Sequence, residues 1–456
     1  MWKMPSFNLI SLGCAKNLVD SEVILGCLAA DGWEFVESPE ESDLLLLNTC
    51  GFIEPAVEEA IDEILELIKI KEQYPGKKLV VVGCLVQRYK EKLAESLPEV
   101  DLFIGTEGAG DVVKLIAPLF HGTESSVVKL PGRMIMDSSL PRVISTPGSR
   151  AWLKITEGCN NRCAYCMIPS IRGNLRSRTV EDLVIEAQNL EQQGIKELSF
   201  IAQDSTAYGN DLGGDVTLVR LVDEILQRTT IPWLRLLYLY PSGISEELLD
   251  LMGENSRVLP YLDIPFQHVN DRILQKMNRR YGGEDLHLLL ERLRKKIPDL
   301  AVRTTFLVGF PGETENEFLE IESFLKEEMI DHVGVFGYAN EEGCPSEKFD
   351  GQVPENEKKR RCDYLLALQA ELSENIQQKY VGRTEPVLVE GVSRETELLL
   401  EGRTRYQAPE VDGCVYINEG EARPGEIVNV RITSAQVYDL VGGIVSKEEK
   451  SSVDEQ

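Results

Sequence analysis

The sequence lacks any run of about 18 apolar residues, the length that a membrane-spanning helix requires. Its first eight residues contain one lysine and no long apolar stretch, unlike a secretory signal peptide. Without such a signal, the ten cysteines of this 456-residue chain are not expected to form a disulfide framework. These absences predict a cytoplasmic protein with reduced thiols and no membrane partner.

Positive charge is also scarce. Lysine and arginine number 48 against 76 aspartates and glutamates, which gives a formal net charge of −28 and a pI near 4.7. Such a surface repels nucleic acid unless a local basic patch compensates. We therefore expect the macromolecular partner to be a basic protein.

The strand and helix patterns divide the chain into segments of different character. Residues 1–120 and 151–378 alternate strand and helix patterns, and residues 381–446 contain only short strand patterns. Residues 121–150 are rich in Ser, Thr, Pro and Gly and predict a linker. The last ten residues, 447–456, predict a disordered tail.

Residues 1–120 predict a parallel α/β domain. Apolar runs at 7–12, 44–47 and 79–82 are typical of strands buried on both faces of a parallel sheet. Helical patterns follow at 17–30, 55–70 and 89–96.

Each of these three runs is followed by a cysteine. Cys14, Cys50 and Cys84 lie just past the predicted carboxyl ends of strands, where open α/β sheets bind ligands. One such cysteine would most simply be a buried core residue. Three in equivalent places favour an iron–sulfur cluster with one iron left open.

Residues 151–378 predict a partial (βα)6 barrel. Strand patterns occur at 152–156, 197–202, 233–238, 261–265, 302–308 and 332–338, with helical patterns at 179–193, 216–228, 244–252, 285–297 and 314–328. Functional side chains of such folds lie at the carboxyl ends of the strands.

The loop after the first of these strands holds Cys159, Cys163 and Cys166 at C-x3-C-x2-C spacing. Three thiolates are one fewer than a closed zinc site or a fully ligated iron–sulfur cluster uses, so one metal atom stays open. Zinc is the alternative, but it usually gathers C-x2-C pairs with further ligands, and this loop contains no histidine.

Polar residues follow other strands of the same domain. Gln203 and Asp204 follow the second strand, Gln267 and His268 the fourth, and a glycine turn beginning at Gly309 the fifth. Arg303 lies within the fifth strand. Taken alone, each of these residues is weak evidence for a binding site. His268 would be a hydrogen-bonded core histidine, and the others would be helix caps or surface groups.

Two basic stretches interrupt the acidic sequence. Residues 171–178 contain three arginines, and Arg279 precedes Arg280. The first is either a solvated loop with Thr179 as helix N-cap or an anchor for an anionic group near the cysteine loop. Both interpretations stay open, as they do for the arginine pair.

Residues 381–446 predict a small antiparallel β-barrel, similar to OB or TRAM barrels, from strand patterns at 385–391, 396–401, 414–417, 425–433 and 436–444. Such barrels often bind RNA through basic grooves and stacking aromatics. Here 11 acidic residues outnumber 6 basic ones, and only Tyr406, Tyr416 and Tyr438 are aromatic. This composition favours docking of a basic protein.

The loop at 156–166 resembles the cluster loop of the radical S-adenosylmethionine (SAM) enzymes. In that superfamily the three cysteines hold a 4Fe-4S cluster and SAM binds the open iron; Tyr165 matches the aromatic residue before the last cysteine. The resemblance implies that SAM contacts the following residues: Tyr165, Gln203, Asp204, Gln267, Arg303 and Gly309.

The whole chain resembles the methylthiotransferases, whose second 4Fe-4S cluster would here be held by Cys14, Cys50 and Cys84. Residues 11–22 (SLGCAKNLVDSE) resemble the branch called RimO, although Ala15 stands where proline is more usual. That branch adds a methylthio group to the β-carbon of an aspartate in small-subunit ribosomal protein number twelve. The alternatives are the tRNA-adenosine branch, called MiaB, and a non-catalytic metal-binding scaffold.

The resemblance also implies a mechanism. The cluster in the cysteine loop reduces SAM, the resulting 5′-deoxyadenosyl radical removes a hydrogen from the aspartate, and the second cluster supplies the sulfur. No side chain is expected to act as an acid or base, since the cofactors carry the chemistry. An electron donor such as flavodoxin or ferredoxin is implied as a partner, and tRNA is not expected to bind.

Overall fold

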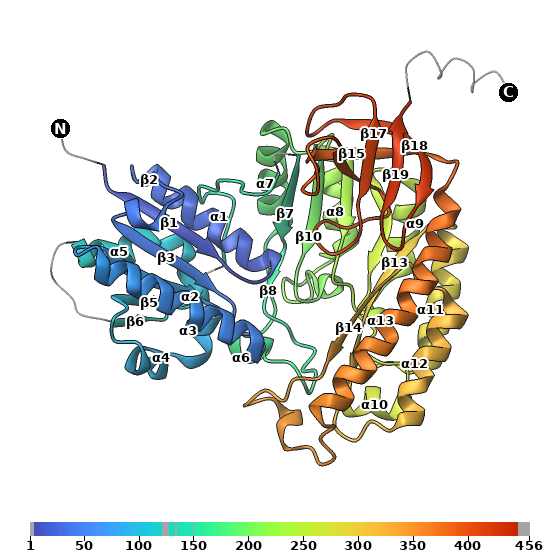
Figure 1. Ribbon diagram of the computed structural model, residues 1–456, viewed down its shortest axis with the longest axis horizontal. Helices are drawn as coiled ribbons and strands as arrows, with labels where there is room; N and C mark the ends of the chain where they lie inside the picture. The colour runs from blue at the N-terminus through green and yellow to red at the C-terminus, as the bar shows by residue number, and fades with distance from the viewer. Residues whose placement is uncertain (1–3, 121–126, 133–134, 148, 446–456) are drawn as a thin grey trace.

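The computed structural model describes residues 4–120, 127–132, 135–147 and 149–445. In these ranges the strands form two six-stranded parallel sheets, a closed five-stranded barrel and one two-stranded hairpin (Figure 1). The predicted fold class, with two α/β parts and a small C-terminal barrel, is therefore confirmed. Residues 447–456, predicted to be disordered, lie outside the described residues.

The N-terminal sheet has the strand order β2-β1-β3-β4-β5-β6. Its core explains the unbroken apolar runs. Along β3, Leu44 and Leu46 pack on one face and Leu45 and Leu47 on the other, and helices cover both faces. The bounds are β1 (Ser6–Ser11), α1 (Ala15–Ala30), β2 (Glu34–Phe35), β3 (Leu44–Thr49), α2 (Glu54–Gln73), β4 (Lys78–Gly83), α3 (Cys84–Tyr89), α4 (Glu91–Ser96), β5 (Leu102–Ile104), α5 (Val112–Phe120) and β6 (Val127–Lys129).

The segment predicted as a linker contributes to this sheet. β6 pairs in parallel with β5, as an edge strand. Three residues carry too little periodicity to mark a strand within a stretch rich in turn-forming residues, so the sequence did not indicate it.

The central sheet has the order β14-β13-β12-β11-β10-β7, and every neighbouring pair is parallel. Its six strands match the six predicted ones. The bounds are β7 (Arg150–Lys154), α7 (Val180–Gln192), β10 (Glu197–Ile201), α8 (Leu218–Arg228), β11 (Trp233–Leu236), α9 (Glu246–Glu254), β12 (Val258–Asp263), α10 (Asp271–Lys276), α11 (Gly283–Lys296), β13 (Ala301–Val308), α12 (Glu315–Glu328), β14 (His332–Gly337) and α13 (Glu355–Gln377).

Not every helix was predicted, since α5, α10 and α13 lie outside the predicted helical patterns. The short α10 lies between β12 and α11, and α13 packs along β14 and α12 before the chain enters the barrel (Figure 1). Charged residues dominate the N-terminal half of α13, which hides its apolar face in the sequence.

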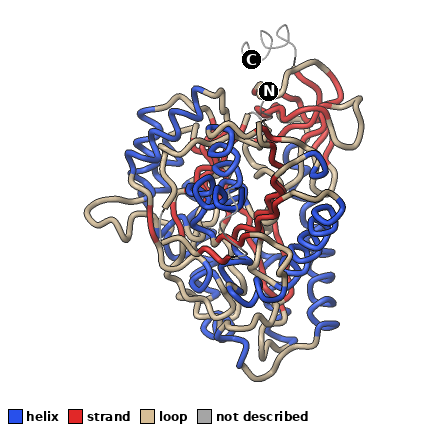
Figure 2. Tube along the Cα trace, turned by 90° about the vertical axis from the view of Figure 1, so that its left-hand side faces the viewer, coloured by secondary structure: helices blue, strands red, loops and turns tan. Residues whose placement is uncertain are grey.

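The C-terminal barrel closes in the order β15-β16-β17-β19-β18. Its strands are β15 (Thr384–Val392), β16 (Leu400–Thr404), β17 (Val415–Glu419), β18 (Ile427–Ala435) and β19 (Leu440–Ile444). All pairs are antiparallel except β17 with β19, which is parallel. Figure 2 shows these strands gathered at one end of the molecule.

The barrel covers the amino ends of the central strands. Arg150, the first residue of β7, lies within 3.2 Å of Glu390, and Glu197, the first residue of β10, binds Arg403 at 2.8 Å. Trp233, the first residue of β11, packs on Leu388. The carboxyl ends of the same strands therefore stay available for a site. No helix in the described ranges has the length and apolar character to cross a bilayer.

Candidate active site

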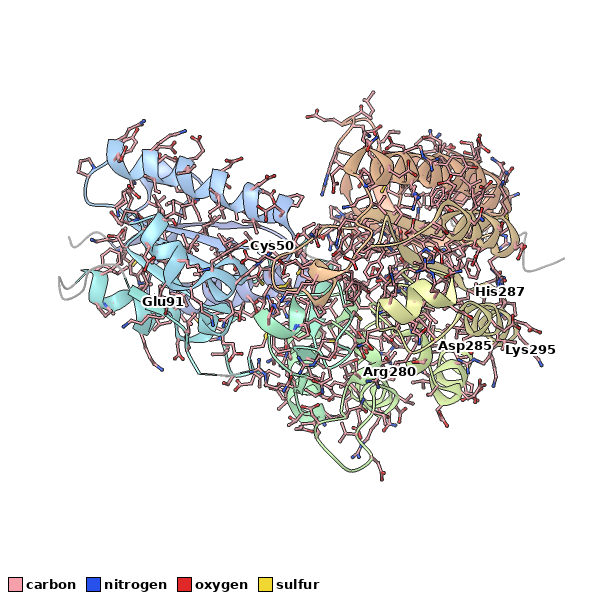
Figure 3. The ribbon with its side chains drawn as sticks, turned by 90° about the horizontal axis from the view of Figure 1, so that it is seen from below. Cys50, Glu91, Arg280, Asp285, His287 and Lys295 are labelled. Atoms are coloured by element: carbon pink, nitrogen blue, oxygen red, sulfur yellow. The ribbon has the colours of Figure 1, made fainter. Side chains whose placement is uncertain are left out.

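The three N-terminal cysteines lie at the carboxyl ends of three adjacent strands. Cys14 follows β1, Cys50 follows β3 and Cys84 follows β4, and these strands are neighbours in the sheet. Cys14 acts electrostatically on Cys50, both of them act on Cys84, and all three thiols are influenced by Arg172. Figure 3 shows Cys50 where the N-terminal part of the chain meets the central part.

A glycine allows the β1 and β3 ends to approach each other. Gly13 has φ +94°, and a Cβ built there would lie 2.8 Å from the Cβ and 3.3 Å from the Sγ of Cys50. Any side chain at this position would enter the space beside the thiols.

The second set of thiols comes from one loop. After the β8 (Thr156–Glu157) hairpin strand, Gly158 turns the chain with φ +71°, and the loop runs through Cys159, Cys163 and Cys166 into α6 (Ile168–Ile171). The hairpin closes with β9 (Arg176–Ser177). Backbone N–H groups of Asn161 and Ile168 lie 3.5 Å from the sulfurs of Cys159 and Cys166, as donors do around bound thiolates.

A cavity opens in front of these three thiols. Its lining combines aromatic and apolar side chains with a few polar groups, as in sites for small molecules. Its lining contains four of the residues predicted to contact SAM: Tyr165, Gln203, Asp204 and Gln267. Asn161 in the cysteine loop donates to Asp204 at 2.7 Å and so joins the loop to the end of β10.

Two other predicted contacts are not brought to this cavity. Arg303 lies near the start of β13, and its guanidinium donates to Asp412 of the barrel at 2.6 Å. The backbone N–H of Gly309 donates to Glu313 at 2.8 Å, and a Cβ there would meet Lys358. His268 is buried with Nδ1 accepting two backbone N–H bonds, which fits a core histidine.

Arg172 connects the N-terminal thiols to the strand that leads into the cysteine loop, a role that the sequence left open. It lies just after α6 and is buried. Its guanidinium donates to Glu157 at 2.9 Å, to Asp20 of α1 at 3.2 Å and to the Cys84 sulfur at 3.5 Å. The basic stretch at 171–178 is thus no solvated loop at this position: Arg172 binds anions at the contact between the N-terminal and central parts.

Arg279 has a comparable position on the cavity side. Its guanidinium lies 3.6 Å from the Cys163 sulfur and 2.6 Å from the Tyr281 hydroxyl, and it lines the cavity. In the sequence Arg279 stood out only because it precedes Arg280, and this pair did not indicate that Arg279 lies near the cysteine loop.

Burial and nearby cations act on the thiols in opposite directions. Burial raises the pKa of Cys84 and of Cys166 to about 12. Desolvation would also raise the pKa of Cys14, but Lys16, Arg172 and two backbone N–H groups lower it below the ordinary value. Of the three N-terminal thiols, Cys14 is therefore the most readily converted to a thiolate.

Around Arg172 the buried charges form one network. Burial would raise the pKa of Glu157, yet Lys154 and Arg172 lower it to about 2. Lys154 also bonds to Asp20 on α1. A neighbouring ion pair joins Arg142 to Glu22 of α1 at 2.6 Å. These contacts fix α1, and with it Cys14, against the central sheet.

The donor sets fit a cluster better than a single ion. Within the described ranges, no three His, Cys, Asp or Glu side chains are placed to hold one metal ion. The three loop thiols nevertheless line one cavity, and the three N-terminal thiols interact electrostatically with one another. A cube of four irons holds its thiolates farther apart than one ion does and leaves one iron for a small molecule.

Comparison with known proteins assigns a family to each part of the chain. Residues 6–105 match the uncharacterized protein family UPF0004, residues 153–325 the radical SAM superfamily, and residues 381–445 the TRAM domain.

Curated relatives match over nearly the whole chain. A ribosomal protein uS12 methylthiotransferase RimO from Desulfotalea psychrophila is 61% identical over 97% of this chain and 100% of its own length. Proteins of the same name from Syntrophotalea carbinolica and Anaeromyxobacter sp. are 46% and 47% identical, over 97% and 96% of this chain and 97% and 93% of their own lengths.

Solved structures share the fold at low identity. The radical SAM methyltransferase TsrM from Kitasatospora setae, with cobalamin and a [4Fe-4S] cluster bound, superposes with a TM-score of 0.57 at 16% identity, over 74% of this chain and 72% of that one. The cobalamin-dependent SAM radical enzyme OxsB has a TM-score of 0.53 at 12% identity, over 76% and 55%.

Proposed function

The chain belongs to the RimO family of ribosomal protein uS12 methylthiotransferases, and from this premise we propose that it adds a methylthio group to the β-carbon of an aspartate in uS12. The observation that carries the proposal is the placement of two separate groups of three thiols at facing strand ends, joined by Arg172. One group of three thiols would hold the cluster that many radical SAM reactions use, whereas the insertion of sulfur needs a second cluster and therefore a second group of thiols.

Six cysteines would hold the cofactors. Cys159, Cys163 and Cys166 would bind one 4Fe-4S cluster, and Cys14, Cys50 and Cys84 the other. When bound, the clusters and SAM supply the electron, the hydrogen-abstracting radical, the sulfur and the methyl group.

The protein's own residues position these groups. Tyr165, Gln203, Asp204 and Gln267 line the space where SAM would lie. The packing of α1 on β7 places Cys14, at the N-terminal end of α1, beside the central sheet. We assign no side chain as a general acid or base, because the cofactors would carry the chemistry.

The partners follow from charge and family. The barrel and the chain as a whole are acidic, which suits a basic ribosomal protein and disfavours tRNA. We propose a cytoplasmic location and an electron donor of the flavodoxin or ferredoxin class.

Anaerobic reconstitution tests the proposal. We expect about eight irons per chain, formation of 5′-deoxyadenosine from SAM under reducing conditions, and a methylthio mass increase on a uS12 aspartate peptide. A tRNA substrate serves as the control for the MiaB-type alternative. Iron binding without 5′-deoxyadenosine would instead support the non-catalytic scaffold, and methylthiolation of tRNA alone would overturn the assignment to uS12.

A further inference from the structure

Lys16 is a buried cation without an acceptor. It lies in the first turn of α1, two residues after Cys14, and only 7% of its surface is exposed. In the described part of the chain no hydrogen bond or ion pair reaches its ammonium, and Nζ instead lies 3.2 Å from the centroid of the Tyr238 ring. The Lys16 side chain is thus largely buried while its ammonium keeps some access to solvent, and the Tyr238 ring is the described group that holds it in place.

None of the described charged groups around Lys16 forms an ion pair with it. Cys14, Asp263, Arg172 and Glu157 are those that act on it electrostatically. Glu157 is bound by Lys154 and Arg172. Asp263 accepts the Tyr238 backbone N–H at 3.3 Å and is attracted by Arg303. The Lys16 ammonium is therefore left for water or for an anionic group that binds from outside the chain.

The position of Lys16 is between the two groups of thiols. On one side is Cys14, whose thiol acts on it electrostatically. On the other is Tyr238, which lines the cavity together with Cys159 and Gln267. Tyr238 holds a left-handed backbone conformation, φ +59°, that is uncommon for a side chain of this size and is typical of functional sites.

We propose that Lys16 binds the side-chain carboxylate of the substrate aspartate. This inference rests on the proposed function. A carbon that loses hydrogen on the cavity side and receives sulfur on the Cys14 side must lie between the two groups of thiols. The carboxylate bonded to that carbon then lies within reach of the ammonium between them, and the pair forms a charge-assisted hydrogen bond. Lys16 thus selects aspartate over asparagine, because an amide carries no charge to pair with it.

A binding cycle between enzyme and peptide tests this. The reconstituted protein is titrated with a fluorescent uS12 peptide containing the acceptor aspartate, and with the same peptide containing asparagine. We expect the wild type to prefer the aspartate peptide at least about tenfold. Lys16→Met should lose this preference by weakening only the aspartate peptide, whereas Lys16→Arg, which keeps the charge, should retain part of it.

Controls separate binding from folding. Lys69→Met removes an exposed lysine from the same part of the chain and should leave both affinities unchanged. Circular dichroism and iron content check that each Lys16 variant is folded and loaded, and Lys16→Gln replaces Lys16→Met if the latter does not fold.

Each contrary result has a defined meaning. Equal weakening of both peptides by Lys16→Met, or an unchanged preference, overturns the assignment to the carboxylate and leaves Lys16 a role toward the thiols. A wild type that methylthiolates the aspartate peptide without preferring it overturns the inference alone. A wild type that neither binds nor modifies either peptide overturns the proposed function itself.

Discussion

At the scale of single residues, the two groups of thiols have different neighbours and therefore different expected roles. Cys163 lies beside Arg279 at the cavity, whereas Cys14 lies beside Lys16 and Arg172 at the end of the N-terminal sheet. A substitution in one group should not remove the ligands of the other.

Cys14→Ala should abolish methylthiolation but leave reductive cleavage of SAM measurable, because the cysteine loop stays complete. Cys163→Ala should abolish both, because it opens a second position on the cluster next to SAM. Chromatographic detection of 5′-deoxyadenosine and mass spectrometry of the peptide measure the two steps separately. Loss of SAM cleavage in a folded, iron-containing Cys14→Ala protein would contradict this division of roles, and Cys27→Ala serves as a thiol control outside both groups.

A second prediction at this scale concerns Glu197, which is fully buried between the central sheet and the barrel. Burial would raise its pKa, but Arg235 and Arg403 lower it from 4.5 to about 2. The stability that the carboxylate contributes is therefore complete above about pH 4.5 and is lost as the pH falls through about 2. Glu197→Gln should cost on the order of 3 kcal/mol at pH 7.

Urea unfolding at pH 7 and pH 3 measures this. The difference between the wild type and Glu197→Gln should be smaller at pH 3 by roughly 2 kcal/mol. The exposed Glu421→Gln should show little difference at either pH. A Glu197→Gln cost that does not change with pH would mean that the ion pairs with the two arginines are not what stabilises the interface.

At the scale of elements, the cysteine loop depends on one glycine. A Cβ at Gly158 would lie 2.2 Å from the carbonyl oxygen of Asn174 and 2.6 Å from that of Gly173, on the segment leading to β9. The loop must therefore move away from this segment if residue 158 has a side chain. Such a shift changes the distances between Cys159 and the other two thiols.

Gly158→Ala should reduce the iron bound after reconstitution to about half, through loss of the loop cluster while the N-terminal cluster stays. Gly194→Ala is the matched control, because Gly194 also has positive φ but no atom within 4 Å of its Cβ position. It should lose stability without losing iron. Full iron content in Gly158→Ala would show that the loop tolerates the shift.

The sequence predicted the helices and strands better than it predicted the contacts of single residues. Strand runs such as 44–47 are apolar on both faces and so predict a buried parallel sheet. The cysteine after each run predicts that the thiols meet at the carboxyl ends of its strands. Arg172 and Lys16 could not be assigned, because their partners come from parts of the chain that become neighbours only when α1 packs on the central sheet. Arg303, for which the resemblance implies a contact with SAM, lies near the start of β13 and pairs with Asp412 of the barrel, a partner that the sequence did not indicate.

At the scale of the whole molecule, charge determines the partner. A net charge of −28 attracts a basic ribosomal protein over distances of about a Debye length, roughly 8–10 Å at physiological ionic strength. Most of this attraction acts before contact and so affects the association rate.

Raising the NaCl concentration from about 50 to about 300 mM should therefore slow the association of uS12 severalfold while changing its dissociation much less. Stopped-flow fluorescence with labelled uS12 measures both rates. An acidic protein of similar size provides the control, and it should not associate at either concentration. An association rate that is independent of salt would show that the acidic surface does not guide the substrate.

The two groups of thiols differ in how far apart their members lie in the chain. Cys159, Cys163 and Cys166 share one loop, so even a partly folded chain can chelate iron with them at a small loss of entropy. Cys14, Cys50 and Cys84 meet only after three strands have paired in order. With the two clusters assigned as proposed, the enzyme would mature in a fixed order. The site for SAM could bind iron early, and the sulfur-donating site only once its own three strands have paired.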